Sequence, residues 1–179
     1  QDAINRKIRA EIQRIIALER KREEEKVKEK VNILYVDDET NNLIAFKATF
    51  RKVYNIFTAE SAVEGKNILS QQPIHIIITD QRMPGVTGVE FLESIILEYP
   101  DPIRILLTGY ADIEAVINAI NKGQVYRYIN KPWDEMELKF VIDNAFEVFS
   151  LRRDNTQLTK SLLRANQQLE FILRQKLLS

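Results

Sequence analysis

Between residues 31 and 149, short apolar runs alternate with segments of helical periodicity. The runs are nearly continuous in β-branched and aliphatic residues, which is typical of strands buried on both faces of a parallel sheet. Five such strands are predicted, beginning at Val31, Tyr54, Ile74, Ile103 and Val125. Helical periodicity lies between them, over residues 40–51, 61–69, 88–98 and 112–122, and again from Trp133 or Asp134. With right-handed crossovers, this alternation predicts an α/β sandwich with helices on both faces of the sheet.

A first long helix is predicted ahead of this core. Residues 1–30 contain no Gly or Pro, and apolar residues follow a heptad spacing as far as Leu18. Residues 19–30 are then a dense mixture of both charges. The segment is either a solvated helix or a dimeric signalling helix that enters from an upstream module, and both interpretations stay open.

The last helical pattern continues almost to Ser179, well past the end of a compact domain. Asn155 occupies position a of the heptads, where a polar residue favours a coiled coil of two helices. Glu147 and Arg152 are spaced for an ion pair between two parallel chains. About 45 helical residues would span about 68 Å, more than a small domain covers. We therefore predict a parallel homodimer, with the N-terminal helix as a second candidate contact. The predicted coiled-coil positions are Val148, Leu151, Asn155, Leu158, Leu162, Leu169 and Ile172.

Three parts are thus expected: an N-terminal signalling or coiled-coil helix (1–30), an α/β domain (31–149) and a coiled-coil extension of the fifth helix (150–179). The 179 residues carry 26 Lys and Arg against 26 Asp and Glu, so no net charge draws the chain to nucleic acid or membrane. Cysteine is absent, which excludes disulfides and thiolate chemistry. No apolar stretch approaches a membrane span. We expect a cytoplasmic protein with no direct nucleic-acid contact and no membrane insertion.

Polar side chains follow four of the predicted strands at the point where each ends. Asp37 and Asp38 follow the first strand, Asp80 the third, Thr108 the fourth and Lys131 the fifth. Because the crevice of an open α/β sheet lies at the carboxyl ends of its strands, these groups should share one edge. Clustered carboxylates repel one another unless a cation is bound or one is protonated. Ligands that are all oxygen favour Mg²⁺.

A magnesium ion beside a nucleophilic carboxylate predicts formation of an aspartyl phosphate. Lys131 would supply a charge to a phosphate oxygen, Thr108 a hydroxyl hydrogen bond, and Gly85 and Gly88 would keep the intervening loop compact. Each signal alone has an ordinary explanation, as a helix cap or a turn. Their order on successive strands is the specific feature.

Residues 31 to about 149 resemble a response-regulator receiver domain of two-component signalling. The motifs that carry the resemblance are Val36-Asp37-Asp38-Glu39, Asp80-x-x-Met83-Pro84-x-x-x-Gly88, Thr108-Gly109-Tyr110-Ala111 and Tyr128-x-x-Lys131-Pro132. The resemblance implies a flavodoxin-like, doubly wound five-stranded parallel sheet of order 2-1-3-4-5, flanked here by long N- and C-terminal helices. It also implies a signalling receiver rather than an enzyme, apart from phosphotransfer to itself and autodephosphorylation.

The same resemblance implies a role for each carboxylate. Asp80 would accept a phosphoryl group from a histidine kinase or a phosphotransfer protein. Asp38 would bind Mg²⁺ directly, together with Asp80 and the main-chain carbonyl of Arg82. Asp37 would act on the ion largely through bound water.

The resemblance also implies how the phosphate is recognised and how long it lasts. Thr108 would hydrogen-bond the phosphoryl group, Lys131 would pair with it, and Tyr128 would be the switch aromatic. Arg82 and Tyr110 would flank the path of a hydrolytic water and tune the lifetime of the phosphate. The signal would pass through the coiled coil to an output partner or to a domain outside this chain.

Two other functions stay open from the sequence alone. The first is a small phosphohydrolase that uses Asp80 as its nucleophile, although Arg82 stands where such enzymes usually carry a second Asp. The second is a constitutive dimer scaffold whose receiver no longer switches.

Overall fold

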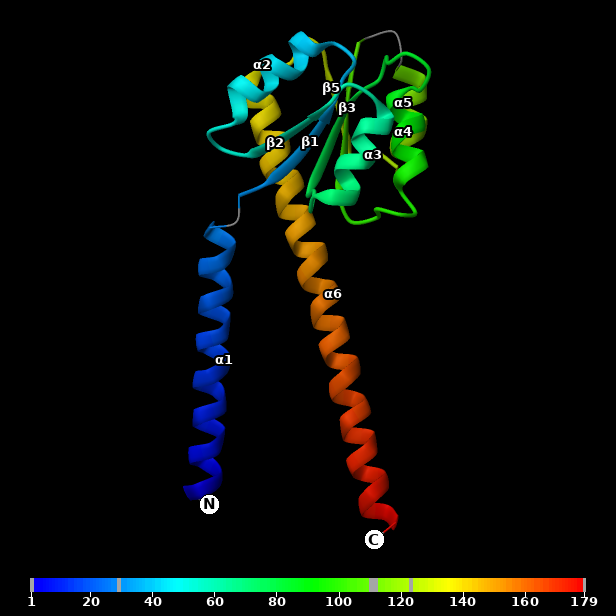
Figure 1. Ribbon diagram of the computed structural model, residues 1–179. Coiled ribbons are helices and arrows are strands. Elements are labelled where there is room, and N and C mark those ends of the chain that lie inside the picture. The colour runs from blue at the N-terminus through cyan, green and yellow to red at the C-terminus, as the bar shows by residue number, and fades with distance from the viewer. Residues whose placement is uncertain (1, 29, 110–112, 123, 179) are drawn as a thin grey trace. The chain divides into compact units, whose positions relative to one another are not determined.

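The computed structural model describes residues 2–28, 30–109, 113–122 and 124–178. The chain divides into two compact units, residues 1–30 and 31–179, which are described separately. The first unit is helix α1 (Asp2–Lys28), and its described side chains are exposed. The second unit holds the sheet, the helices around it and the long helix α6 (Glu135–Leu178) (Figure 1).

A five-stranded parallel sheet forms the centre of the second unit. Its order is β2-β1-β3-β4-β5, which confirms the predicted order. The strands are β1 (Asn32–Val36), β2 (Asn55–Ala59), β3 (Ile76–Asp80), β4 (Ile103–Thr108) and β5 (Arg127–Asn130). Every residue of β3 and β4 is buried, as expected for strands covered on both faces.

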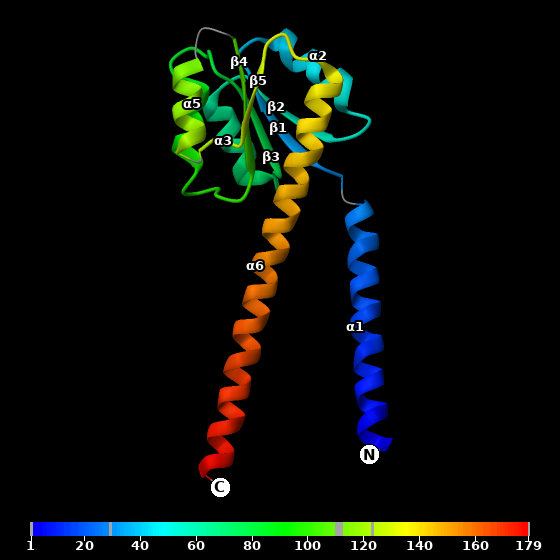
Figure 2. The ribbon, with the colours of Figure 1, turned by 180° about the vertical axis from the view of Figure 1, so that it is seen from behind.

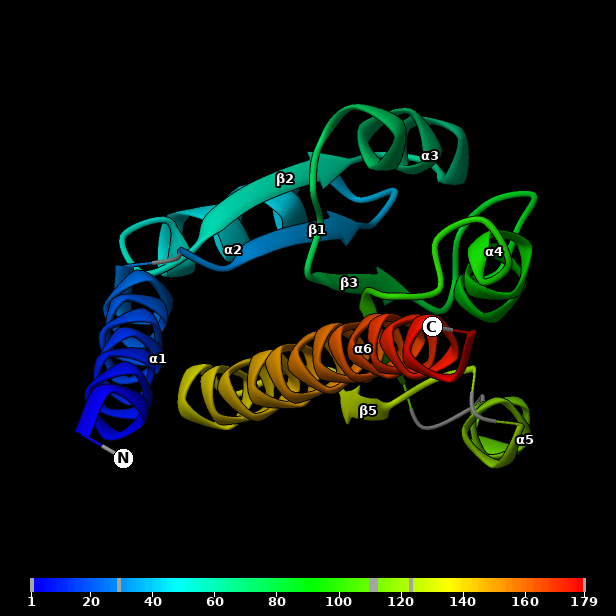
Figure 3. The same cartoon turned by 90° about the horizontal axis from the view of Figure 1, so that it is seen from below.

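Helices cover both faces of this sheet and separate two apolar cores. The remaining helices are α2 (Thr40–Phe50), α3 (Ala62–Gln71), α4 (Gly88–Ile95) and α5 (Ile113–Asn121). Helices α2 and α6 pack on one face around Phe46 and Ile142, which belong to the first core. Helices α3, α4 and α5 pack on the other face around Phe91 and Leu92, which belong to the second core. Figure 2 shows both layers from behind, and Figure 3 shows α3 and α4 on the far side of the sheet from α2.

Several element boundaries differ from the sequence-based prediction. The third strand begins at Ile76 rather than Ile74, and the fifth at Arg127 rather than Val125. Ile74 and Val125 are buried in the second core, so their apolar character reflects packing rather than strand pairing. Helix α4 ends at Ile95 instead of residue 98.

Local capping sets the helix starts that surround the site. The Ser61 hydroxyl accepts the N–H of Glu64 at the start of α3. Thr87 and Glu90 form a reciprocal capping box at the start of α4. Before α6, the Asp134 carboxylate accepts the N–H of Glu137 at 2.9 Å. These caps fix where the chain turns from each strand into the next helix.

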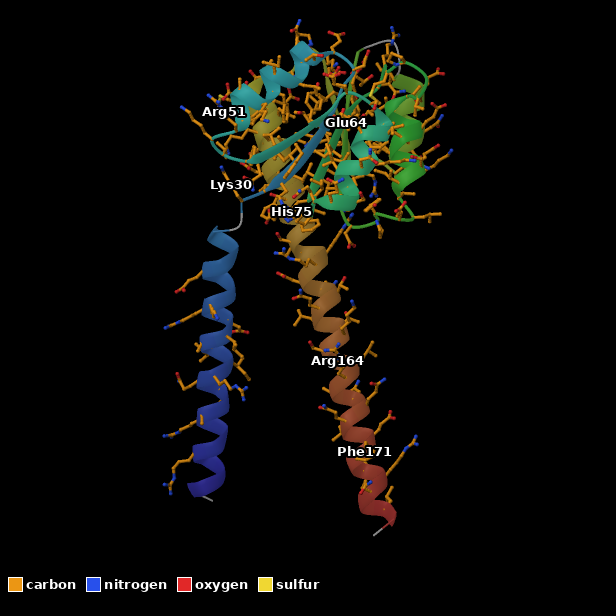
Figure 4. The ribbon with its side chains drawn as sticks, viewed as in Figure 1. Lys30, Arg51, Glu64, His75, Arg164 and Phe171 are labelled. Atoms are coloured by element: carbon orange, nitrogen blue, oxygen red, sulfur yellow. The ribbon has the colours of Figure 1, made fainter. Side chains whose placement is uncertain are left out.

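Helix α6 changes surroundings along its length. Val141, Ile142 and Ala145 are buried against the sheet, and Val148 is half-buried against the same core. From residue 155 onward every described side chain is exposed. Figure 4 shows Arg164 and Phe171 on this outer part, whereas His75 lies where α6 leaves the sheet. Among the described residues, no helix is both long enough and apolar enough to cross a membrane.

Candidate functional site

Three carboxylates meet at the carboxyl ends of neighbouring strands. Asp37 directly follows β1, Asp80 is the last residue of β3, and these two strands pair in parallel. One carboxylate oxygen from each of Asp37, Asp38 and Asp80 lies within 4.8 Å of the others. Asp37 and Asp80 are buried, whereas Asp38 is exposed. The sheet therefore brings together the cluster that the sequence predicts.

Lys131 reaches this cluster from the end of β5. Its Nζ lies 2.7 Å from Oδ1 of Asp80 and 3.1 Å from Oδ2 of Asp37. Its main-chain N–H donates to the carbonyl oxygen of Thr108 at 2.9 Å, which ties the end of β5 to the end of β4. One ammonium thus stands among three carboxylates, and the site keeps a surplus of negative charge.

Burial and the neighbouring charges act against each other at Asp80. Burial raises the pKa of Asp80 above its ordinary value, Lys131 opposes that rise, and the negative charge of Asp37 adds to it. Burial alone would lower the pKa of Lys131, but its hydrogen bonds to Asp80 and Asp37 outweigh burial and raise that pKa. Lys131 is therefore a permanent cation, whereas the charge on Asp80 is costly without further positive charge.

Asp37 is held by more donors than the sequence suggests. Its Oδ2 accepts the Tyr35 hydroxyl at 2.5 Å, the Asn42 amide at 3.1 Å and Lys131, and its Oδ1 accepts the N–H of Glu39 at 2.9 Å. Strand alternation puts residues 35 and 37 on the same face, so the pattern carried a signal for this tyrosine. No comparable signal marked Asn42, which comes from the first turn of α2.

The donor set suits a small hard cation. Both oxygens of Asp37 are already engaged, whereas Asp38 is exposed and Asp80 keeps acceptor capacity beyond Lys131 and the Arg82 N–H. Mg²⁺ binds through one or two carboxylates and keeps several waters. Asp38 and Asp80 could hold such an ion, and its charge would offset the excess of carboxylates.

The loop after β3 packs closely against Asp80. The Arg82 N–H donates to Oδ2 of Asp80 at 3.1 Å, and the Arg82 side chain is exposed. Buried Gln81 anchors the loop, because its carbonyl accepts the N–H of Gly88 and its side chain accepts the N–H at the next position. A Cβ on Gly88 would lie 2.3 Å from the Asp80 carbonyl oxygen, and Gly85 has a φ of 80°. Both glycines are therefore required by the loop, as predicted.

The other predicted site residues lie around the same edge. Thr108 is fully buried at the end of β4, and its hydroxyl donates to the Gly109 carbonyl at 3.0 Å. Tyr128 on β5 is half-buried and packs against the second core. Tyr110, predicted to tune the phosphate lifetime, lies outside the described residues.

The predicted coiled-coil positions fall into two groups. Val148 contacts the first core of its own domain, so this position already has partners within the chain. The apolar positions beyond it expose more than half of their side chains, namely Leu151, Leu158, Leu162 and Leu169, and Asn155 is exposed among them. The side chain of Ile172 lies outside the description.

Residues 33–143 match the sequence pattern of the response regulator receiver domain. The chain belongs to this family. The receiver is 38% identical over 130 residues to the hydrogenase transcriptional regulatory protein HoxA of Cupriavidus necator, covering 73% of this chain and 27% of that one. It is 33% identical over 137 residues to a putative NtrX-like response regulator of Rickettsia felis, covering 74% and 28%. The chain thus spans about a quarter of the length of these relatives.

Solved structures place the receiver in the same fold. A receiver domain from Clostridium thermocellum superposes with a TM-score of 0.64 at 31% identity, covering 68% of this chain and 98% of that one. A Rhodopirellula baltica structure described as an adenylate cyclase gives 0.71 at 31% identity, covering 74% and 98%. Receiver domains are signalling domains that bind Mg²⁺ through acidic residues and interact with histidine kinases or phosphotransfer proteins.

Proposed function

We propose that this receiver accepts a phosphoryl group on Asp80 from a histidine kinase or phosphotransfer protein and transmits its state through α6. The observation that carries the proposal is the position of Asp80. It is the last residue of a central strand, it lies 2.7 Å from Lys131, and its carboxylate belongs to a cluster of three. No other described carboxylate combines these features.

In this mechanism, a carboxylate oxygen of Asp80 attacks the phosphorus of a phosphohistidine. The new P–O bond forms as the P–N bond breaks, and the imidazole leaves with a proton from solvent. Only the ionised carboxylate is nucleophilic. Burial raises the pKa of Asp80 and Lys131 opposes that rise, so the contact with Lys131 favours the ionised carboxylate. The reaction rate should therefore rise as pH increases through that pKa.

The chain's own groups would stabilise the product. Lys131 can pair with one phosphoryl oxygen, and the Thr108 hydroxyl can turn from the Gly109 carbonyl to another. Mg²⁺, held by Asp38, Asp80 and the Arg82 carbonyl, would supply positive charge to the phosphoryl oxygens. The oxygens of Asp37 already accept four protein donors, which disfavours direct coordination of the ion. Asp37 would therefore act on the ion largely through bound water.

Tyr128 and α6 would carry the change outward. Movement of Thr108 toward a phosphoryl oxygen would leave space into which the half-buried Tyr128 can turn. Lys131 lies four residues before α6, so rearrangement at the site acts at the root of this helix. We propose that residues 1–30, 31–149 and 150–179 act as a signalling helix, a receiver and a coiled-coil extension. The exposed leucines would then pair two chains in parallel.

Labelling with acetyl phosphate tests the acceptor. In the presence of Mg²⁺ we expect one phosphoryl group per chain, lost in Asp80→Asn and strongly reduced in Asp38→Asn. Asp101→Asn, an exposed carboxylate outside the cluster, is the matched control. Labelling of Asp80→Asn to the same extent would refute the assignment.

The same preparation separates the rival functions. Repeated turnover of a phosphate monoester would support a phosphohydrolase. Solution scattering and mass, measured with and without beryllofluoride and Mg²⁺, test the switch and the dimer together. Identical curves would support a scaffold that does not switch.

For the lifetime of the phosphate, Arg82→Ala and the corresponding change at Tyr110 should alter autodephosphorylation without abolishing labelling.

A further inference from the structure

A second charged feature lies at the opposite end of β4 from Thr108. A cavity of about 230 Å³ is present there, lined by Ile103, Arg104, Ile120, Val125, Tyr126 and Arg152. Arg104 precedes Thr108 by four residues, which corresponds to about 13 Å along a strand. The cavity is therefore separate from the carboxylate cluster and has no part in the phosphoryl chemistry proposed above.

Arg104 is a buried cation held in a fixed orientation. The residue is 7% exposed, although charged residues are rarely buried without an ionic partner. Nε donates to the Gln124 carbonyl at 2.8 Å, and Nη1 donates to the carbonyls of Pro102 and Pro100 at 3.1 and 3.3 Å. These three bonds use Nε and Nη1, and a guanidinium carries five N–H groups. Among the described residues, no acceptor is present for Nη2.

Arg152 brings a second positive charge to the same cavity from α6. Burial lowers the pKa of Arg104, and the charge of Arg152 lowers it further. None of the residues that line the cavity is acidic. Within the described part of the chain, neither guanidinium forms an ion pair with a carboxylate. Two like charges therefore converge on one hollow with nothing present to neutralise them.

We propose that this cavity binds a small oxyanion, a phosphate or a carboxylate with only a few carbon atoms, between Arg104 and Arg152. Guanidinium groups match the geometry of both anions. The volume is below the range of about 300–1,000 Å³ typical of drug-sized ligands, so a nucleotide does not fit. Ile103, Ile120 and Val125 give the wall an apolar part suited to a short carbon chain.

Such an anion would link the sheet to α6. Arg104 belongs to β4, whereas Arg152 lies on α6 just beyond its packed part. Neutralising both charges removes their repulsion and gives each a shared acceptor. Anion binding would therefore hold the root of the outer helix against the domain, and would bias its orientation independently of Asp80.

Calorimetric titration with inorganic phosphate and with butyrate tests the site on the full chain, in EDTA and against a sodium chloride control of equal ionic strength. We expect a dissociation constant of about 1 mM for the better anion, the range that a few charge-assisted hydrogen bonds provide. Comparison of the two dissociation constants shows whether the cavity prefers a phosphate or a carboxylate. The Nε resonances of Arg104 and Arg152 should shift with the same midpoint.

Arg152→Gln should weaken binding about tenfold, because it removes one charge-assisted contact. Arg153→Gln is the matched control, since Arg153 lies over the Phe149 ring and does not line the cavity. Equal affinity in both variants, or heats no greater than those of chloride, would overturn the proposal. Acetyl phosphate labelling of the same proteins, in Mg²⁺ and without EDTA, keeps the two sites apart, because Arg152→Gln should label as the parent does.

Discussion

The carboxylate cluster and the outer half of α6 differ in how much of their environment one chain supplies. At the cluster, strands, loop and lysine meet within a single domain, and Asp37 alone accepts four donors. Beyond the sheet, Leu151, Leu158 and Leu162 are each more than half exposed. One region is complete within the chain, and the other has apolar residues that nothing in the described chain covers.

This difference separates two kinds of stability. The cluster is fixed by the fold, so changes there should alter the stability or the electrostatics of one chain whatever its concentration. A helix with an exposed apolar stripe gains stability when another surface covers it, so its energetics should depend on protein concentration. Measurements at low and high protein concentration therefore distinguish the two regions.

The largest effect is expected at Gly88. Gly88→Ala places a Cβ 2.3 Å from the Asp80 carbonyl oxygen and 2.8 Å from a methyl of Leu106, so the loop must shift. Overpacking of this kind costs about 3 kcal/mol in the free energy of unfolding. Urea denaturation should show this loss equally at low and high protein concentration. Gly109→Ala, where a Cβ meets nothing within 4 Å, should change stability by less than about 0.5 kcal/mol.

The paired leucines of α6 should behave in the opposite way. Leu158→Ala with Leu162→Ala should raise the dissociation constant of the proposed dimer about 100-fold, because each chain loses two buried side chains at the contact. Sedimentation equilibrium measures this constant. Unfolding of the dilute monomer should change by less than about 0.5 kcal/mol. Lys160→Ala, on the outer face of the same heptad, is the control, and an unchanged association state in the double variant would contradict a leucine-mediated dimer.

Much of the domain could be predicted because its signals are local. Continuous apolar runs gave the strands, and their order along the chain placed Asp80 and Lys131 at one edge. The strands predicted to begin at Ile74 and Val125 begin two residues later in the structure. Burial in a core and pairing in a sheet select the same residue types, so the pattern could not distinguish them. An apolar pattern reports burial, and only the structure shows whether a neighbouring strand or a helix provides it.

The parts of the site that the sequence missed depend on tertiary contacts. Asn42 comes from a helix turn, and Gln81 acts through its buried amide, so neither has a sequence pattern of its own. Arg104 resembled any strand residue until its three carbonyl acceptors were seen. Val148 fitted a heptad, but the domain core already contacts it. Periodicity fixes the face of a helix, whereas the partner of that face depends on the fold.

A smaller effect is expected at Lys131, the one ammonium of the cluster. Lys131→Met removes the group that opposes burial at Asp80, so the pKa of Asp80 should rise further. Carbon-detected NMR titration of the Asp80 carboxyl measures this shift. Lys139→Met is the control, because Lys139 pairs with Asp143 at 2.6 Å outside the cluster. A pKa that moves equally in both variants would mean that the lysine contact has no specific effect.

The smallest effect tests the sign of the charge balance at Asp80. The pKa of Asp80 is raised in the folded state, so the protonated form of Asp80 stabilises the fold. This stabilisation is fully present below the pKa of the unfolded chain, near 4, and is lost as pH rises through the pKa of the folded chain. At pH 7 the wild-type chain lacks this contribution, whereas Asp80→Asn keeps a neutral side chain. We expect the variant to be more stable by about 1 kcal/mol in EDTA, by thermal unfolding. The advantage should shrink toward pH 4, and Mg²⁺ should reduce it by stabilising only the wild type. A variant less stable at pH 7 would mean that the contact with Lys131 outweighs burial and the repulsion from Asp37.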